Sequence, residues 1–145
     1  MTIFIGSDHG GFELKEQLIE YLQEQNIRVE DVGAHQIDTN DDFPDFAKKV
    51  AESVLANLHE HMGILICRSG TGMAITANRF DNIYCGVPLS EEHVKKMREH
   101  NHVNILALPA DYVDLETAKT YVELFLSTST NNGEKYVRRM KKIDG

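Results

Sequence analysis

The sequence predicts an α/β fold: a three-layer α/β/α sandwich around a five-stranded, mainly parallel, Rossmann-like sheet. Short apolar runs alternate along the chain with longer segments in which apolar residues recur at helical spacing. Such runs, apolar along their length, are typical of parallel strands that helices cover on both faces. A chain of 145 residues suffices for one core, so we expect residues 1–145 to form a single domain.

Five strands are expected where the apolar runs stop at turn-forming residues. The first run stops at Asp8-His9-Gly10-Gly11, the second at Gly33, and the third at a glycine-rich turn. The expected strands are residues 2–7, 27–32, 63–67, 83–87 and 103–108.

Helices are expected in the segments between and after these strands. Pro44 suits a helix start, and Ser90 suits an N-cap followed by an acidic first turn. Val50, Val54 and Leu58 form an apolar face that we expect in the core. The expected helices are residues 12–22, 44–58, 70–79, 91–101 and 115–126, followed by a basic helical arm within about residues 131–145.

The composition excludes several classes of protein. A net charge of −8 argues against a nucleic-acid binder, which usually carries a basic stripe. No apolar run approaches the ~20 residues that span a bilayer, and the N-terminus lacks signal-peptide features, so we expect a cytoplasmic protein without a membrane partner. Cys67 and Cys85 show no metal-ligand spacing, and we expect no disulfide.

Residues 63–73 combine a strand, a glycine-rich turn and a helix start: Gly-Ile-Leu-Ile-Cys-Arg-Ser-Gly-Thr-Gly-Met. Backbone N–H groups converge at such a junction, and the helix dipole adds partial positive charge, so the junction can hold an anion. The same field favours the thiolate form of the neighbouring Cys67. A base beside an anion cradle suits removal of a proton next to a carbonyl, where an enediolate must be stabilised.

Ligands of parallel α/β sheets bind beyond the carboxyl ends of the strands. Asp8 and His9 follow the first strand and Cys67 ends the third, so these three residues can share one crevice. His100 instead precedes the fifth strand. We expect it to reach that crevice only from another subunit.

Three motifs together are similar to those of one family. They are Gly-Ser-Asp-His-Gly-Gly-Phe-Glu-Leu-Lys at 6–15, the junction at 63–73 with Ala-Asn-Arg at 77–79, and Arg-Glu-His-Asn at 98–101 with Asn-Ile-Leu at 104–106. Over essentially its whole length the chain resembles the type B ribose-5-phosphate isomerases, a group that includes the paired subunits of galactose-6-phosphate isomerase.

The resemblance implies aldose-ketose isomerisation of a sugar phosphate through an enediolate, with ribose 5-phosphate and ribulose 5-phosphate as the expected pair in the pentose phosphate pathway. It implies no cofactor and no metal. Cys67 matches the catalytic base, and Ser69 matches a hydroxyl residue that assists proton movement between the two oxygens. The cradle for the enediolate matches the backbone N–H groups of Ser69, Gly70, Thr71, Gly72 and Met73. A second branch of the family has glutamate at position 73, so this chain resembles the cysteine branch.

Other matches concern ring opening and substrate orientation. His100 matches the residue that helps to open the furanose ring, and Asp8 matches the carboxylate near the ring hydroxyl. His9 and Asn101 match groups that orient the substrate.

The resemblance also implies a homodimer or homotetramer with active sites at the subunit interface. In the family the C-terminal arm supplies cations to the substrate phosphate. Lys135 and Arg139 align with two of them.

The chain departs from the family pattern at four positions that bear on specificity. Asp111 lies in the turn where the family has a phosphate-binding arginine, and an acid there would repel phosphate. Lys135 replaces a bidentate guanidinium with a point charge. Arg68 replaces a common glycine and could supply the missing phosphate contact. Phe43 replaces a tyrosine and lacks its hydroxyl.

Each site residue also has a purely structural explanation. Cys67 could be a small core residue, as we expect for Cys85. Asp8 could be no more than a cap of the first helix. His100 and Asn101 could be no more than the end of a helix, where a cation or an Asn cap is favourable.

Three other functions fit parts of the sequence. One is isomerisation of a different sugar phosphate, a tetrose, hexose or deoxy sugar, which Asp111, Lys135 and Arg68 suggest. Another is a non-catalytic subunit of a hetero-oligomeric isomerase. The third, a phospho-acceptor signalling domain, fits poorly because Cys67 stands where the acceptor aspartate would be.

Overall fold

The computed structural model describes residues 1–145. Its strands are β1 (Thr2–Ser7), β2 (Arg28–Asp31), β3 (His61–Cys67), β4 (Cys85–Gly86) and β5 (Ile105–Pro109). Its helices are η1, a 3₁₀ turn (His9–Gly11), α1 (Phe12–Glu24), α2 (Phe43–Leu55), α3 (Thr71–Ala77), α4 (Glu91–Asn101), α5 (Leu115–Ser127) and α6 (Glu134–Asp144). The predicted α/β fold is confirmed.

The five strands form one parallel sheet in the order β2-β1-β3-β5-β4. β1 and β3 are neighbours, with Ser7 paired to Ile66. Both are buried along almost their whole length, which explains their mostly apolar sequences. Their carboxyl ends therefore lie side by side, near the middle of the sheet's carboxyl-terminal side.

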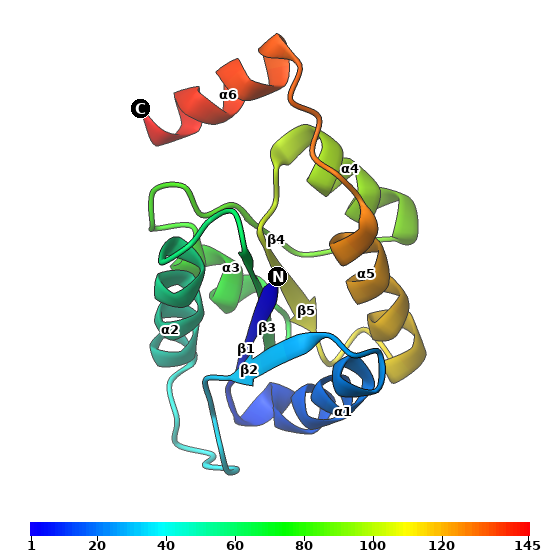
Figure 1. Ribbon diagram of the computed structural model, residues 1–145. Helices are drawn as coiled ribbons and strands as arrows, with labels where there is room; N and C mark the ends of the chain where they lie inside the picture. Colours follow the sequence, from blue (N-terminus) through cyan, green and yellow to red (C-terminus); the bar gives the residue numbers. More distant parts are fainter.

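Helices cover both faces of the sheet (Figure 1): α1, α4 and α5 one face, and α2 and α3 the other. Successive strand residues alternate between the two layers. Ile64 and Ile66 belong to the core under α1 and α5, whereas Leu65 and Cys67 belong to the core under α2 and α3. The Cys67 side chain therefore lies on the α2/α3 side of the sheet.

Local sequence signals set most helix starts. The Ser90 side chain accepts a hydrogen bond from the His93 N–H at 3.1 Å, as expected of an N-cap. Pro44 lies in the first turn of α2. The prediction that Leu58 belongs to the core is wrong. Because α2 ends at Leu55, Leu58 lies in the following turn with 42% of its surface exposed.

The fourth strand is shorter than the predicted residues 83–87. The Tyr84 N–H donates to the Asn104 side chain and not to a strand partner, and the paired residues are only Cys85 and Gly86. The Asn78 side chain binds the N–H and the carbonyl oxygen of Cys85.

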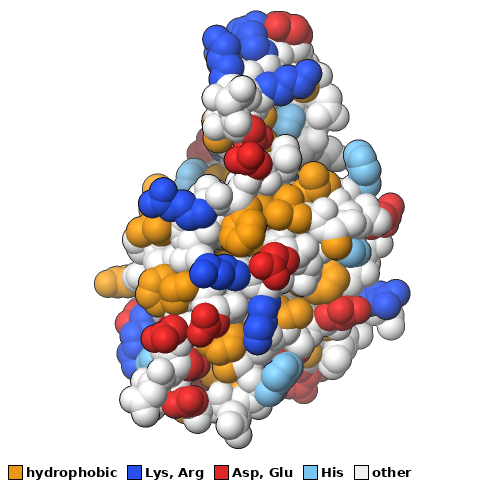
Figure 2. Space-filling model, turned by 90° about the vertical axis from the view of Figure 1, so that its left-hand side faces the viewer, with side chains coloured by type: hydrophobic (Ala, Val, Ile, Leu, Met, Phe, Trp, Pro, Cys, Tyr) orange, Lys and Arg blue, Asp and Glu red, His pale blue; other side chains and the backbone are white.

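Helix α6 projects from the body and carries several Lys and Arg side chains (Figure 2). Two anchors fasten it: Met140 is buried, and the Asp144 carboxylate accepts hydrogen bonds from the Asn82 N–H and the Tyr84 hydroxyl. No helix in the structure is both long and apolar enough to cross a membrane.

Candidate active site

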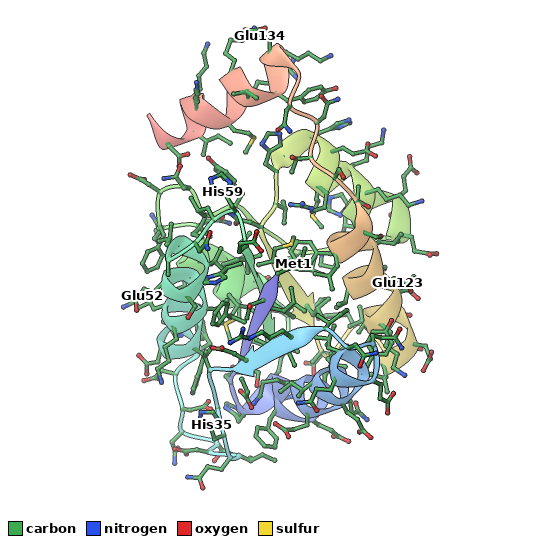
Figure 3. All side chains as sticks on the ribbon, in the orientation of Figure 1. Met1, His35, Glu52, His59, Glu123 and Glu134 are labelled. Atoms are coloured by element: carbon green, nitrogen blue, oxygen red, sulfur yellow. The ribbon has the colours of Figure 1, made fainter.

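The carboxyl ends of β1 and β3 bring together the first group of candidate residues. Asp8 and His9 directly follow β1, and Cys67 is the last residue of β3. The loop between β2 and α2, where His35 is labelled, lies at this end of the molecule, far from Glu134 at the start of α6 (Figure 3). A single chain therefore assembles the Asp8, His9 and Cys67 group by itself.

Cys67 lies at the base of the glycine turn and is 6% exposed. Its Sγ accepts a hydrogen bond from the Gly70 N–H at 3.1 Å. Gly70 has a φ of +75°, and a Cβ there would lie 3.2 Å from the Ala107 carbonyl oxygen. The turn therefore requires glycine, and its geometry directs an N–H group at the sulfur.

Backbone amides at the start of α3 follow this turn. The first helical hydrogen bond runs from the Ala74 N–H to the Gly70 oxygen, so the amides of Gly72 and Met73 precede the helical ladder. The Thr71 N–H donates to the exposed Ser69 hydroxyl at 3.3 Å. The Met73 side chain is fully buried, so this residue can offer only its amide to a ligand. These amides can stabilise a developing anion beside the sulfur.

Asp8 is buried and caps η1. Its Oδ1 accepts hydrogen bonds from the N–H groups of Gly10 at 2.9 Å and Gly11 at 3.3 Å. Burial raises the pKa of the Asp8 carboxyl above its ordinary value, although these hydrogen bonds lower the pKa in part. Asp8 therefore has the capping role, and its carboxyl is also more easily protonated than a surface aspartate.

His9 contacts Asp41, which the sequence did not single out. The distance between Nδ1 of His9 and Oδ1 of Asp41 is 2.6 Å, and the His9 backbone N–H donates to the same oxygen at 3.2 Å. The ligand atoms of Asp8, His9 and Asp41 all lie within 4.8 Å of one another, a spacing that could also hold a metal ion. In the structure His9 and Asp41 instead bond to each other.

Arg68 and Phe43 lie above the turns that carry these groups. The Arg68 side chain crosses Gly10, where an added Cβ would lie 2.6 Å from the Arg68 Cγ. The Phe43 ring lies against Gly72, where an added Cβ would be 2.6 Å from the ring. Phe43 therefore bounds the space next to the α3 amides, and Arg68 covers the turn after β1.

His100 and Asn101 lie at the opposite side of the sheet, where the amino ends of the strands lie. They end α4 and precede β5, whereas Cys67 pairs with Pro109 at the carboxyl end of β5. The five residues of β5 separate its two ends by about 13 Å, at ~3.3 Å per step. One chain therefore does not bring His100 to Cys67.

The C-terminal arm lies beside His100. The Tyr136 ring stacks on the His100 imidazole with centroids 5.3 Å apart and 13° between the planes. Lys135 and Arg139, both exposed, lie 5.0 and 6.0 Å from the Tyr136 ring centroid. His100 and the two cations thus form a second group, at the end of the molecule where α6 projects (Figure 1).

The second cysteine differs from Cys67 in its surroundings. Burial raises the pKa of the Cys85 thiol, and no glycine turn adjoins it. The raised pKa makes Cys85 a poor nucleophile or base.

Comparison with known proteins shows the family to which this chain belongs. A family model described as Ribose/Galactose Isomerase matches residues 3–143. The chain is 31% identical over 140 residues to ribose-5-phosphate isomerase B of Mycolicibacterium paratuberculosis, covering 97% of this chain and 87% of that protein.

Solved structures agree with this match. A ribose 5-phosphate isomerase from Thermotoga maritima superposes with a TM-score of 0.93 at 43% identity, covering 99% of this chain and 97% of that one. Ribose-5-phosphate isomerase B from Mycoplasma genitalium, solved with bound ribulose-5-phosphate, also has a TM-score of 0.93, at 36% identity and covering 99% and 93% of the two chains.

Proposed function

Because this chain belongs to the ribose/galactose isomerase family, we propose that it interconverts ribose 5-phosphate and ribulose 5-phosphate without a cofactor. The observation that carries the proposal is the position of Cys67, whose sulfur accepts the Gly70 N–H beside the unpaired amides of α3. A thiolate and an anion cradle in contact suit proton transfer through an enediolate.

Cys67 is the base in this reaction. Its thiolate takes the proton from carbon 2 of the open-chain aldose, and the carbonyl at carbon 1 becomes the enediolate. The Ser69 hydroxyl passes a proton between the oxygens on carbons 1 and 2, and Cys67 then returns its proton to carbon 1. The amides of Gly72 and Met73 stabilise the negative charge while it lasts.

Ring opening requires the second group of residues. Asp8 receives the proton of the hydroxyl on carbon 1, the bond between carbon 1 and the ring oxygen breaks, and His100 donates a proton to the ring oxygen. Since His100 lies at the opposite side of the sheet in its own chain, it comes from the partner of a homodimer or a larger homo-oligomer. Residues 1–145 act as one domain, and the arm at about 131–145 serves the partner's site with Lys135 and Arg139 on the phosphate.

A second candidate substrate, another sugar phosphate, is favoured by one observation. Asp111 stands in the turn after β5, and the Arg68 guanidinium nitrogen lies 3.7 Å from its carboxylate. This ion pair changes the charge offered to a phosphate at that turn.

The free cysteines support a proposal for the cellular setting. Both cysteines are free thiols, and a reducing compartment protects a thiolate base from oxidation. The proposed setting is the cytoplasm.

The test follows deuterium from solvent into carbon 2 of ribose 5-phosphate by NMR, with the other aldose phosphates as a panel. Wild-type protein should exchange and isomerise ribose 5-phosphate best, and Cys67→Ala should lose about 10³-fold or more in kcat. Cys85→Ala is the matched control and should stay close to wild type. A folded Cys67→Ala variant with near-normal activity would refute the assignment, and an inactive wild-type homo-oligomer would favour a non-catalytic subunit.

A further inference from the structure

The loop between β2 and α2 brings a carboxylate to His9 that neither the sequence motifs nor the family match assigns. Resting on the proposed function, we infer that Asp41 is a positioning residue: it holds His9 with the proton on Nδ1 and leaves Nε2 for the substrate.

One oxygen of Asp41 binds His9 twice. Oδ1 lies 2.6 Å from the ring Nδ1 and 3.2 Å from the backbone nitrogen. The carboxylate thereby links the main chain and the ring of the same residue, which restricts rotation of the imidazole. Nε2 makes no hydrogen bond within the chain, so this nitrogen is the one available to a ligand.

The contact is shielded from water. The Asp41 side chain is 9% exposed and the His9 side chain 26%. The second carboxylate oxygen of Asp41 is buried and has no hydrogen-bond partner in the protein. No hydrogen bond to this oxygen offsets the cost of burying the carboxylate. The N–H groups of His9, which bind the other oxygen, are therefore the groups that stabilise it.

The loop that carries Asp41 is fastened at its first end by β1 and α1. Ser7 exchanges backbone hydrogen bonds with Gly33 and Ala34 at 2.7 and 2.8 Å. The buried Lys15 donates to the Ala34 carbonyl oxygen at 2.6 Å and to Asp31 at 2.7 Å.

At its second end the loop meets the glycine turn, since the Phe43 ring lies against Gly72. Asp41 is therefore held between two anchors. Its approach to His9 is a feature of the fold and not a chance contact of a surface side chain.

The tautomer decides what His9 can do. Which ring nitrogen carries the proton is set by the hydrogen bond that the other makes. With Nδ1–H donated to Asp41, the neutral ring presents Nε2 as an acceptor, and in the protonated ring both nitrogens are donors. Without Asp41 the neutral ring could present a donor at Nε2 and could also rotate.

The first measurement is ¹⁵N NMR of the histidine rings in the full-length protein without substrate, with His9 identified from a His9→Gln spectrum. Wild type should show the Nδ1–H tautomer at His9 above the pH at which the ring deprotonates. Asp41→Ala should shift the ring toward the Nε2–H form, and Asp41→Asn, which keeps an acceptor, should retain Nδ1–H. The neighbouring exposed Asp42→Asn is the control and should leave the ring unchanged.

The second measurement is kinetic, on the same variants. Asp41→Ala should raise KM about tenfold with a smaller change in kcat, and Asp41→Asn should recover part of the loss. An Nε2–H ring in the wild type, or a tautomer and KM unaffected by Asp41→Ala, would overturn the proposal. The NMR result needs no turnover, so an inactive enzyme with the expected tautomers would refute the proposed function and leave this inference standing.

Discussion

Arg68 and Asp111 form an ion pair, 3.7 Å apart, between the turn after β3 and the turn after β5. The backbone joins the same two turns, because the Asp111 N–H donates to the Arg68 carbonyl oxygen at 2.9 Å. The acid that stands in place of a phosphate-binding arginine therefore has a cation beside it. We propose that this pair influences which sugar phosphate the protein prefers.

Asp111→Asn should free the Arg68 guanidinium for the substrate phosphate. Because both side chains are well exposed, the pair is worth ~1 kcal/mol at most, and KM for ribose 5-phosphate should fall by no more than about fivefold. The gain should shrink in high salt. Glu123→Gln, a distant surface change, serves as control, and a rise in KM for Asp111→Asn would mean that Asp111 itself binds the substrate.

Lys15→Met should destabilise the protein strongly. The ammonium is fully buried and bonds Asp31 and the Ala34 carbonyl oxygen. Its loss leaves the Asp31 carboxylate without its cation, although the Gly33 N–H still donates to it, and leaves the Ala34 oxygen without this donor. We expect a loss of about 3 kcal/mol in the free energy of unfolding, since Asp31 keeps some solvent contact. Urea unfolding at a fixed protein concentration measures it. Glu16→Gln removes the exposed partner of Lys15 and should change stability by under about 0.5 kcal/mol; equal effects of the two variants would contradict this account.

Asp8→Asn should make folding more stable at neutral pH. Burial raises the pKa of the Asp8 carboxyl in the folded protein, so its contribution to stability is present below the ordinary value of 3.8 and is lost as pH rises through the raised pKa. Asn keeps the cap and carries no charge. Urea unfolding should therefore show the variant more stable than wild type at pH 7, with the difference vanishing near pH 3. A less stable variant at pH 7 would mean that the Gly10 and Gly11 hydrogen bonds outweigh desolvation.

Gly72→Ala should lower kcat by about tenfold or more, because the new methyl would meet the Phe43 ring and displace the amides of α3. Phe43→Ala removes the obstacle. The double variant Gly72→Ala/Phe43→Ala should therefore be more active than Gly72→Ala alone. Simple additivity of the two single effects would show that the ring is not the cause.

The sequence predicted the layers of the fold because burial and capping are local signals. The mostly apolar β1 and β3 and the Ser90 cap are examples. Leu58 was wrongly predicted to lie in the core because it is apolar and matches the helical spacing. Helix α2 ends three residues earlier.

Part of the candidate site could not be predicted from the sequence, because its residues are far apart along the chain. Asp41 meets His9 across 32 residues, and Tyr136 meets His100 across a longer stretch of chain. No spacing rule links such pairs, and each partner alone is an ordinary polar or aromatic residue in a polar segment. Only the folded chain shows them in contact.

The central claim is that one active site combines Cys67 of one chain with His100 of its partner. Subunit exchange between Cys67→Ala and His100→Asn variants, each nearly inactive alone, tests it most directly. In a mixed dimer one site carries both lesions and the other carries none, so a randomly exchanged equal mixture should regain about a quarter of wild-type activity. An exchanged mixture that stays inactive, with mixed dimers demonstrated by mass spectrometry, would contradict the claim.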